Sequence, residues 1–134
     1  MRPICINCNV CRELGAGETW HGSVTKIMKS SCERVWKLSA DFTSINKYAK
    51  FIDKCDHVEG ERNEIGCVRY CSGVEAGNGS NEQRMVWAKE KLLTMDPVNH
   101  CYSYSIIDGN LGMEGYVANF KVYNITHGDG SCVV

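Results

Sequence analysis

The chain has 134 residues, of which 43% are hydrophobic and 23% are charged, a composition typical of one globular domain. Its 15 Lys and Arg nearly balance its 16 Asp and Glu, so the formal net charge is −1. This balance disfavours a nucleic-acid-binding protein that depends on neutralising phosphates. No apolar run approaches the roughly 20 residues of a membrane-spanning helix, and the N-terminal sequence has no continuous apolar stretch typical of a secretion signal. We therefore expect a soluble, cytoplasmic protein.

The chain contains nine cysteines. An odd number without a secretion signal favours free thiols over a disulfide framework. Cys5, Cys8 and Cys11 form a Cys-x-x-Cys-x-x-Cys run that could begin a zinc or iron–sulfur site. A closed tetrahedral site needs a fourth ligand, however, and the segment offers none before His21. We expect neither a metal nor another cofactor, and interpret residues 1–19 as a cysteine-rich, irregular tail that precedes a domain at residues 20–134.

Regular structure is expected to begin near Trp20. Alternating apolar and polar residues predict a half-buried strand over Trp20–Met28. The sequence Ser30-Ser31-Cys32-Glu33 fits a capping box, with Ser first and Glu three residues later, and predicts the start of a helix. Apolar residues continue at helical spacing as far as Phe42. A second short helix is expected at Ser44–Ala49.

The remainder of the chain predicts strands joined by turns. A turn at Gly60–Asn63 indicates a hairpin, and the glycine-rich Gly73–Ser80 segment indicates a flexible turn. The expected strands are Lys54–Glu59, Ile65–Ser72, Gln83–Met95, Cys101–Ile107, Tyr116–Ile125 and a short one that starts at Ser131 and is cut off at Val134. Consecutive strands with tight turns predict an α+β fold built on a curved antiparallel sheet.

Side-chain alternation singles out one pair of opposite charges. Glu90 shares the more apolar face of its long strand with Ala88, and Arg69 lies between Cys67 and Cys71 on the preceding strand. Antiparallel neighbours could place Arg69 and Glu90 side by side. The pair is either a solvated cross-strand ion pair worth about 0–1 kcal/mol, or a buried functional pair in which the carboxylate finds a cationic partner. The pattern alone slightly favours the first interpretation.

Tyrosines alternate along two later strands. Tyr102 and Tyr104 share one face of a strand, and Tyr116 shares a face of the next strand with Phe120. Aromatic residues at this spacing usually belong to a core, although a phenol can also present its hydroxyl to a ligand cavity. The pattern favours the core. The four histidines are scattered singly, so the sequence does not support a hydrolase triad.

Together these segments resemble the plant lachrymatory factor synthase family. The residues that carry the resemblance lie in the expected order over four strands: Val58-Glu59-Gly60-Glu61, Gly66-Cys67-Val68-Arg69-Tyr70, Trp87-Ala88-Lys89-Glu90-Lys91-Leu92 and Tyr102-Ser103-Tyr104. The similarity covers residues 20–134. The wider superfamily is the START-like, polyketide cyclase superfamily, which has the helix-grip fold and includes the birch-pollen-allergen-type proteins.

The resemblance implies a curved antiparallel sheet that grips a long C-terminal helix around a cavity for a small apolar ligand. In the synthase family, a cavity arginine and glutamate rearrange an alkenyl sulfenic acid to a thial S-oxide by proton transfer. These catalytic residues match Arg69 and Glu90. Cavity tyrosines match Tyr104 and Tyr116, and Ala88, on the face of Glu90, is expected to bind the ligand with them.

In that family the last strand and the long helix would follow Val134. The sequence as given therefore predicts a helix-grip fold with a truncated C-terminal strand and without the C-terminal helix. Two functional classes remain open. The protein is either an isomerase or lyase that depends on Arg69 and Glu90, or a non-catalytic carrier or receptor of a lipid, hormone or secondary metabolite. Catalysis requires Glu90 to exchange a proton, whereas carriage does not. The expected partner is a small hydrophobic ligand or a sulfenic-acid-like substrate.

Overall fold

The computed structural model describes residues 10–14, 18–22, 25, 27–76, 83–124 and 132–133. The described elements, in chain order, are β1 (Val10–Leu14), β2 (Glu18–Gly22), β3 (Ile27–Met28), α1 (Cys32–Ser39), the 3-10 helix η1 (Phe42–Lys47), β4 (Lys54–Glu59), β5 (Val68–Ala76), β6 (Gln83–Asp96), β7 (Cys101–Gly109), β8 (Val117–Lys121), β9 (Tyr123–Asn124) and β10 (Cys132–Val133).

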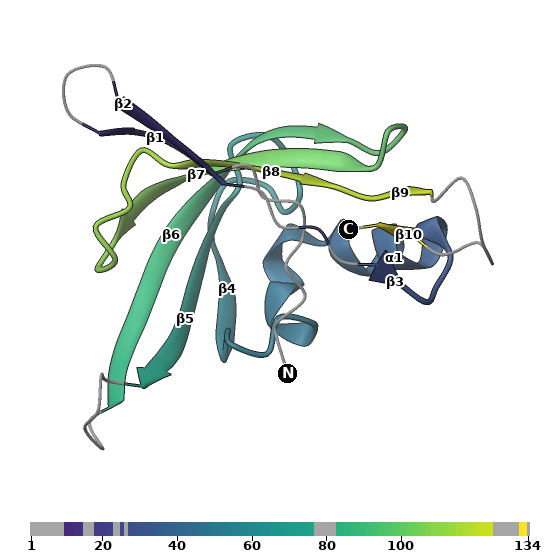
Figure 1. The fold of residues 1–134 in the computed structure, drawn as a ribbon. Helices are drawn as coiled ribbons and strands as arrows, with labels where there is room; N and C mark the ends of the chain where they lie inside the picture. Colours follow the sequence, from purple (N-terminus) through teal and green to yellow (C-terminus); the bar gives the residue numbers. More distant parts are fainter. Residues whose placement is uncertain are drawn as a thin grey trace.

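These strands form two antiparallel sheets (Figure 1). The larger sheet has seven strands in the order β2-β1-β8-β7-β6-β5-β4, and the smaller has three in the order β3-β10-β9. From β4 to β8, each strand pairs with the next one along the chain. The larger sheet bends so that η1 lies inside the bend, while α1 lies next to the smaller sheet (Figure 1). The predicted curved antiparallel meander is therefore confirmed.

Most predicted strands are present, with changed ends. β4 has the predicted bounds, and β6 extends one residue beyond its prediction. β5 begins at Val68 rather than Ile65 and continues through Gly73 to Ala76, into the segment predicted to be a turn. The physical reason is pairing, because β6 offers ladder partners to β5 as far as Gln83, opposite Ala76.

Two predicted strands are each divided between the two sheets. The Trp20–Met28 segment contains β2, in the larger sheet, and β3, in the smaller. Likewise Tyr116–Ile125 contains β8 and β9. Val122 separates the latter two strands, and its N–H bonds to the carbonyl of His100 instead of continuing the ladder. Alternation along one segment cannot reveal such a change of sheet, because each piece keeps the same period.

The N-terminal segment also departs from expectation. Residues 1–19 were expected to be irregular, but Val10–Leu14 forms β1, so the expectation is wrong for these residues. β1 pairs with β2 along its whole length and meets β8 where Cys11 lies opposite Val117. The sequence of β1, Val-Cys-Arg-Glu-Leu, does not alternate between apolar and polar residues, which explains why the pattern did not indicate a strand. Cys5 and Cys8 lie outside the described residues.

Two short caps position the helices. Ser31 is the N-cap of α1, one residue later than the predicted Ser30, and its Oγ accepts a hydrogen bond from the N–H of Arg34 at 3.3 Å. Asp41 caps η1, where its carboxylate accepts hydrogen bonds from the N–H of Thr43 at 3.2 Å and the hydroxyl of Ser44 at 2.6 Å. Side-chain oxygens at these positions satisfy N–H groups that have no partner within the helix.

The main core lies between α1, η1 and the larger sheet. Its buried members include Trp36 of α1, Phe42 of η1 and Leu92 of β6. Tyr102 of β7 and Phe120 of β8 stack with their ring centres 4.7 Å apart. Phe42 meets the edge of Tyr102 at 5.9 Å. This packing fixes the position of η1 against the sheet.

We predict that Asp41→Ala lowers the free energy of unfolding by about 1 kcal/mol at neutral pH, the usual effect of losing an N-cap. Burial opposes ionisation of Asp41, but hydrogen bonds from Ser44 and Thr43 outweigh it and lower the pKa of the carboxyl below its ordinary 3.8. A lowered folded-state pKa stabilises the protein above the ordinary value, and this stabilisation is lost as pH falls through the folded-state value. The difference between wild type and variant should therefore shrink in acid, as urea unfolding at several pH values would measure.

The matched control is Asp56→Ala. Asp56 forms an exposed ion pair with Lys54 at 3.2 Å, and its side chain is 51% exposed. We expect a change within about 0.5 kcal/mol, as for most surface substitutions. An equal loss in both variants would contradict the capping role of Asp41.

Candidate functional site

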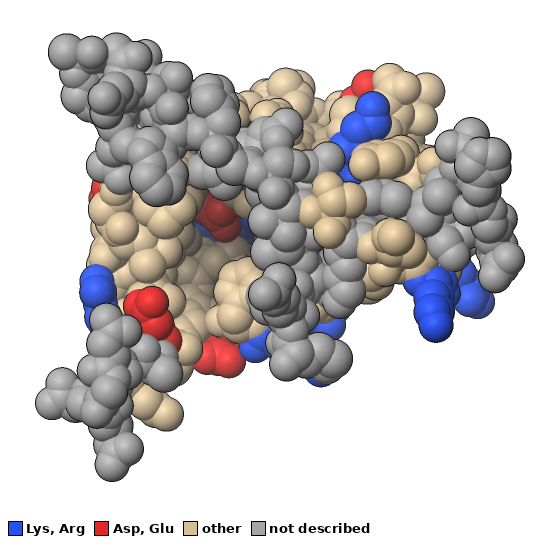
Figure 2. Space-filling view, viewed as in Figure 1, with Lys and Arg blue, Asp and Glu red and all other residues tan. Residues whose placement is uncertain are grey.

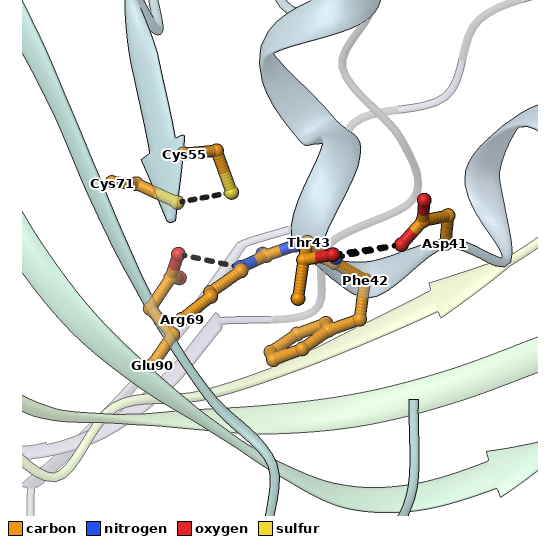
Figure 3. Close-up of polar contacts among 7 residues, drawn as sticks. All are labelled: Asp41, Phe42, Thr43, Cys55, Arg69, Cys71 and Glu90. Atoms are coloured by element: carbon orange, nitrogen blue, oxygen red, sulfur yellow. Dashed lines mark hydrogen bonds and ion pairs between the residues drawn. The ribbon is translucent and has the colours of Figure 1, made fainter. Parts of the chain in front are cut away.

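A buried ion pair links the neighbouring strands β5 and β6. Arg69 and Glu90 are directly opposed in the ladder, and the Nε of Arg69 donates to the Oε1 of Glu90 at 3.1 Å (Figure 3). Arg69 is 0% exposed and Glu90 is 8% exposed. The prediction that Arg69 and Glu90 lie side by side on adjacent strands is confirmed. The interpretation of a solvated pair is wrong, because η1 and β7 cover the guanidinium.

The rest of the Arg69 guanidinium is held by η1 and β7. Its Nη1 donates to the carbonyl oxygen of Phe42 at 2.7 Å. The guanidinium carbon lies 3.9 Å from the ring centre of Phe42 and 4.8 Å from that of Tyr104, distances suited to cation–π contacts. Nη2 is buried and has no hydrogen-bond partner in the described part of the chain. Nη2 is therefore a donor group of the guanidinium that no described residue satisfies.

Electrostatics keeps Arg69 charged despite its burial. Burial, the largest single cause, disfavours the charged guanidinium, but Glu90, Tyr102 and other neighbours together outweigh it, and the pKa of Arg69 is raised above its ordinary value. A charge buried away from water is strongly destabilising unless a counter-ion lies next to it. The pair is thus a fixed feature of the folded state.

An apolar cavity of about 200 Å³ opens beside Glu90. Its walls include Ile45 of η1, Ile106 of β7 and Met113 of the following loop. Glu90 is the only charged residue among the described residues that line it. The space-filling view shows a hollow with largely uncharged surroundings and an acidic group in its depth (Figure 2). Such a cavity suits a small apolar ligand with one polar group.

Gly73 allows a loop to close one side of this cavity. Gly73 and the loop residues Phe51 and Ile52 all line it. A Cβ at Gly73 would collide with the carbonyl oxygen of Phe51. The absence of a side chain is therefore what lets this loop lie directly on β5.

The structure brings most of the predicted site residues together. Glu90, Ala88 and Tyr104 line the cavity. Arg69 does not line it, but lies behind Glu90 and against the ring of Tyr104. Tyr116 is half-buried and is not among the described lining residues; its carbonyl oxygen accepts a hydrogen bond from the N–H of Ile106 at 2.9 Å.

Sequence reasoning missed Phe42 as part of the site. It was assigned to the apolar stripe of the first helix, but it begins η1 and contributes both its carbonyl oxygen and its ring to Arg69. No local signal distinguishes this role, because an apolar residue at helical spacing simply predicts burial.

Among the described helices, none is long and apolar enough to cross a membrane.

The sheet, the two short helices and the apolar cavity together define a START-like protein of the helix-grip class. Residues 19–134 match the family model described as polyketide cyclase / dehydrase and lipid transport, and the chain belongs to this family. The family supports the binding of small hydrophobic ligands.

The same fold occurs in several solved structures. Ginseng major latex-like protein 151 from Panax ginseng has 21% identity and a TM-score of 0.62, over 82% of this chain and 70% of that one. An uncharacterised protein from Bacillus thuringiensis has 21% identity and a TM-score of 0.67, over 85% and 72%. Ara h 8.0201 has 19% identity and a TM-score of 0.59, over 82% and 69%. At these identities the similarity establishes the fold.

We predict that Arg69→Met lowers the free energy of unfolding by about 3–5 kcal/mol, because it leaves the Glu90 carboxylate buried without its cation. The double variant Arg69→Met/Glu90→Leu should recover part of this loss, since no unpaired charge remains. Urea unfolding of the wild type, both single variants and the double variant measures the coupling. Strictly additive losses would show that the two charges do not act as a pair.

The exposed pair of Lys54 and Asp56 provides the matched control. Lys54→Met removes the same kind of contact at a solvated position. The expected change is less than about 1 kcal/mol. A loss as large as that of Arg69→Met would mean that burial is not the cause of the effect.

Proposed function

We propose that this protein binds a small, mostly apolar molecule in the cavity and transfers a proton within it through Glu90. The observation that carries the proposal is the single carboxylate in an otherwise uncharged cavity, held from behind by a buried arginine. A carboxylate at such a position can take a proton from one atom of a bound molecule and return it to another.

The proposed reaction is the rearrangement of an alkenyl sulfenic acid to a thial S-oxide. Glu90 accepts the proton of the S–O–H group, the electrons of the O–H bond form the S=O unit, and the carbon–carbon double bond shifts to the carbon–sulfur position. The distal carbon then takes the proton back from Glu90. The reaction is an isomerisation, so no external reductant, oxidant or cofactor is required. The resemblance of the Arg69 and Glu90 segments to the lachrymatory factor synthase family supports this choice of substrate.

Arg69 has two roles in this proposal. Its Nε contact orients the carboxylate of Glu90 and stabilises its negative charge. Its Nη2, which has no hydrogen-bond partner among the described residues, is the donor proposed for the substrate oxygen as charge develops there. Because Arg69 does not line the cavity, the second role requires Tyr104 or Phe42 to move aside when the substrate binds. Tyr104 lines the cavity and is proposed to orient the substrate.

A carrier or receptor of a lipid, hormone or secondary metabolite is the second candidate. The observation that favours it is the existing partnership of Glu90 with Arg69, because a carboxylate already paired can serve simply as a polar anchor for the ligand. In this case the cavity binds and releases its ligand unchanged.

Glu90→Gln separates the two candidates, because glutamine keeps the shape of the side chain but cannot exchange the proton. For an isomerase we expect turnover of an alkenyl sulfenic acid, generated in situ, to fall about 10²–10⁴-fold. Binding of an apolar fluorescent dye should change little. Measured turnover equal to that of the wild type would overturn the proton-transfer role.

Glu75→Gln is the control, because Glu75 is an exposed carboxylate on the same strand as Arg69. Its turnover should match that of the wild type. A wild-type protein that binds the dye but produces no thial S-oxide above the uncatalysed rate would favour the carrier.

A further inference from the structure

Two thiols face each other on strands β4 and β5. Cys55 and Cys71 are directly opposed in this ladder, and their Sγ atoms lie 3.5 Å apart (Figure 3). Both are free thiols in the structure. Opposed residues of antiparallel strands have Cα atoms about 4.5–5.5 Å apart, within the roughly 4.4–6.8 Å that disulfides span. The backbone is therefore already placed for a bond, and only the side chains need to rotate.

The two thiols differ in their surroundings. The Cys71 thiol donates its hydrogen bond to the sulfur of Cys55, which lowers the pKa of Cys55, and the positive charge of Arg69 lowers it further. The same hydrogen bond, together with burial, raises the pKa of Cys71. Cys55 is half-buried, whereas Cys71 is 6% exposed and lines the cavity. Cys55, the less buried of the two residues, therefore loses its proton more readily, and the thiol of Cys71 lies directly opposite it.

We propose that Cys55 and Cys71 are a redox-active dithiol, which a hydroperoxide converts to a disulfide in the wall of the ligand cavity. This arrangement of a reactive thiolate and an adjacent resolving thiol is typical of redox-active cysteine pairs. The inference is independent of the proton-transfer function, because neither Glu90 nor a bound substrate takes part in it.

The chemistry balances in two steps. The Cys55 thiolate attacks one oxygen of the hydroperoxide, the O–O bond breaks, and the alkoxide that leaves takes a proton to become an alcohol. The sulfur of Cys55 is now a sulfenic acid. The sulfur of Cys71 attacks it, the S–O bond breaks, and the oxygen leaves as water with the proton of the Cys71 thiol. The two thiols lose two electrons in all, and the peroxide gains them.

The disulfide would alter the cavity. Cys71 is a lining residue opposite Ala88, which also lines the cavity. Forming the bond draws its sulfur from 3.5 Å to about 2.05 Å from that of Cys55. It also joins the edge strand β4 covalently to β5. Oxidation therefore changes the shape of the ligand site and strengthens the attachment of the edge strand.

The test is oxidation of the whole chain with one equivalent of hydrogen peroxide, followed by alkylation of the remaining thiols, digestion and mass spectrometry. We expect a Cys55–Cys71 disulfide as the main product, reversed by dithiothreitol. In Cys71→Ser, a sulfenic acid should persist on Cys55 and react with dimedone. Cys101→Ser is the matched control, since Cys101 is another half-buried free cysteine, and it should form the disulfide as the wild type does.

A second measurement follows the cavity itself. Oxidation should change the affinity for an apolar fluorescent dye and raise the Tm in the wild type, and should do neither in Cys55→Ser. Glu90→Gln should form the disulfide normally, so a failure of the proton-transfer proposal leaves this one standing. The dithiol proposal is overturned if Cys55 is oxidised no faster than Cys101, or if other cysteine pairs form disulfides in comparable yield.

Discussion

Burial of the Arg69 guanidinium is the constraint on which the site depends. A guanidinium removed from water must find acceptors for its N–H groups and a counter-ion for its charge. Glu90 of β6 supplies the counter-ion, and the carbonyl of Phe42 in η1 supplies a second acceptor. The rings of Phe42 and Tyr104 cover the guanidinium. A register shift of one residue between β5 and β6 would turn Glu90 to the other face. One side chain therefore couples the register of the sheet to the position of η1.

The burial of Arg69 also explains why Glu90 is the charged residue among the described residues that line the cavity. Arg69 is covered completely, and Glu90 retains a small exposed surface toward the cavity. The other described lining residues are uncharged, so Glu90 is the group that would set the orientation of a bound ligand. Phe51 lies directly on Gly73, and both residues line the cavity. Val86, the ladder partner of Gly73, lines it as well. Shape and polarity of the site thus come from the same few strands.

Alternation of side chains predicted those features of the fold and site that depend on one strand or on two neighbouring strands. It found the proximity of Arg69 and Glu90, which follows from a period of two. The bounds of β4 were instead predicted from the hairpin turn at Gly60–Asn63. Alternation could not find the burial of the ion pair, because it assigns a face and not the element that covers it. It also missed β1, because the residues Val10–Leu14 do not alternate between apolar and polar. Tyr116 illustrates the same limit, because its position relative to the cavity depends on how the whole sheet bends.

Arg69 also links the ion pair to the dithiol. It lies two residues from Cys71 on β5, on the same face of the strand. After the hydrogen bond from Cys71, its charge is a further cause of the lowered pKa of Cys55. The positive charge of Arg69 thus acts on two groups, the carboxylate of Glu90 in the cavity and the thiol of Cys55. The dithiol nevertheless does not need Glu90, because the largest cause of the lowered pKa of Cys55 is the hydrogen bond from Cys71, which lies directly opposite it on β5.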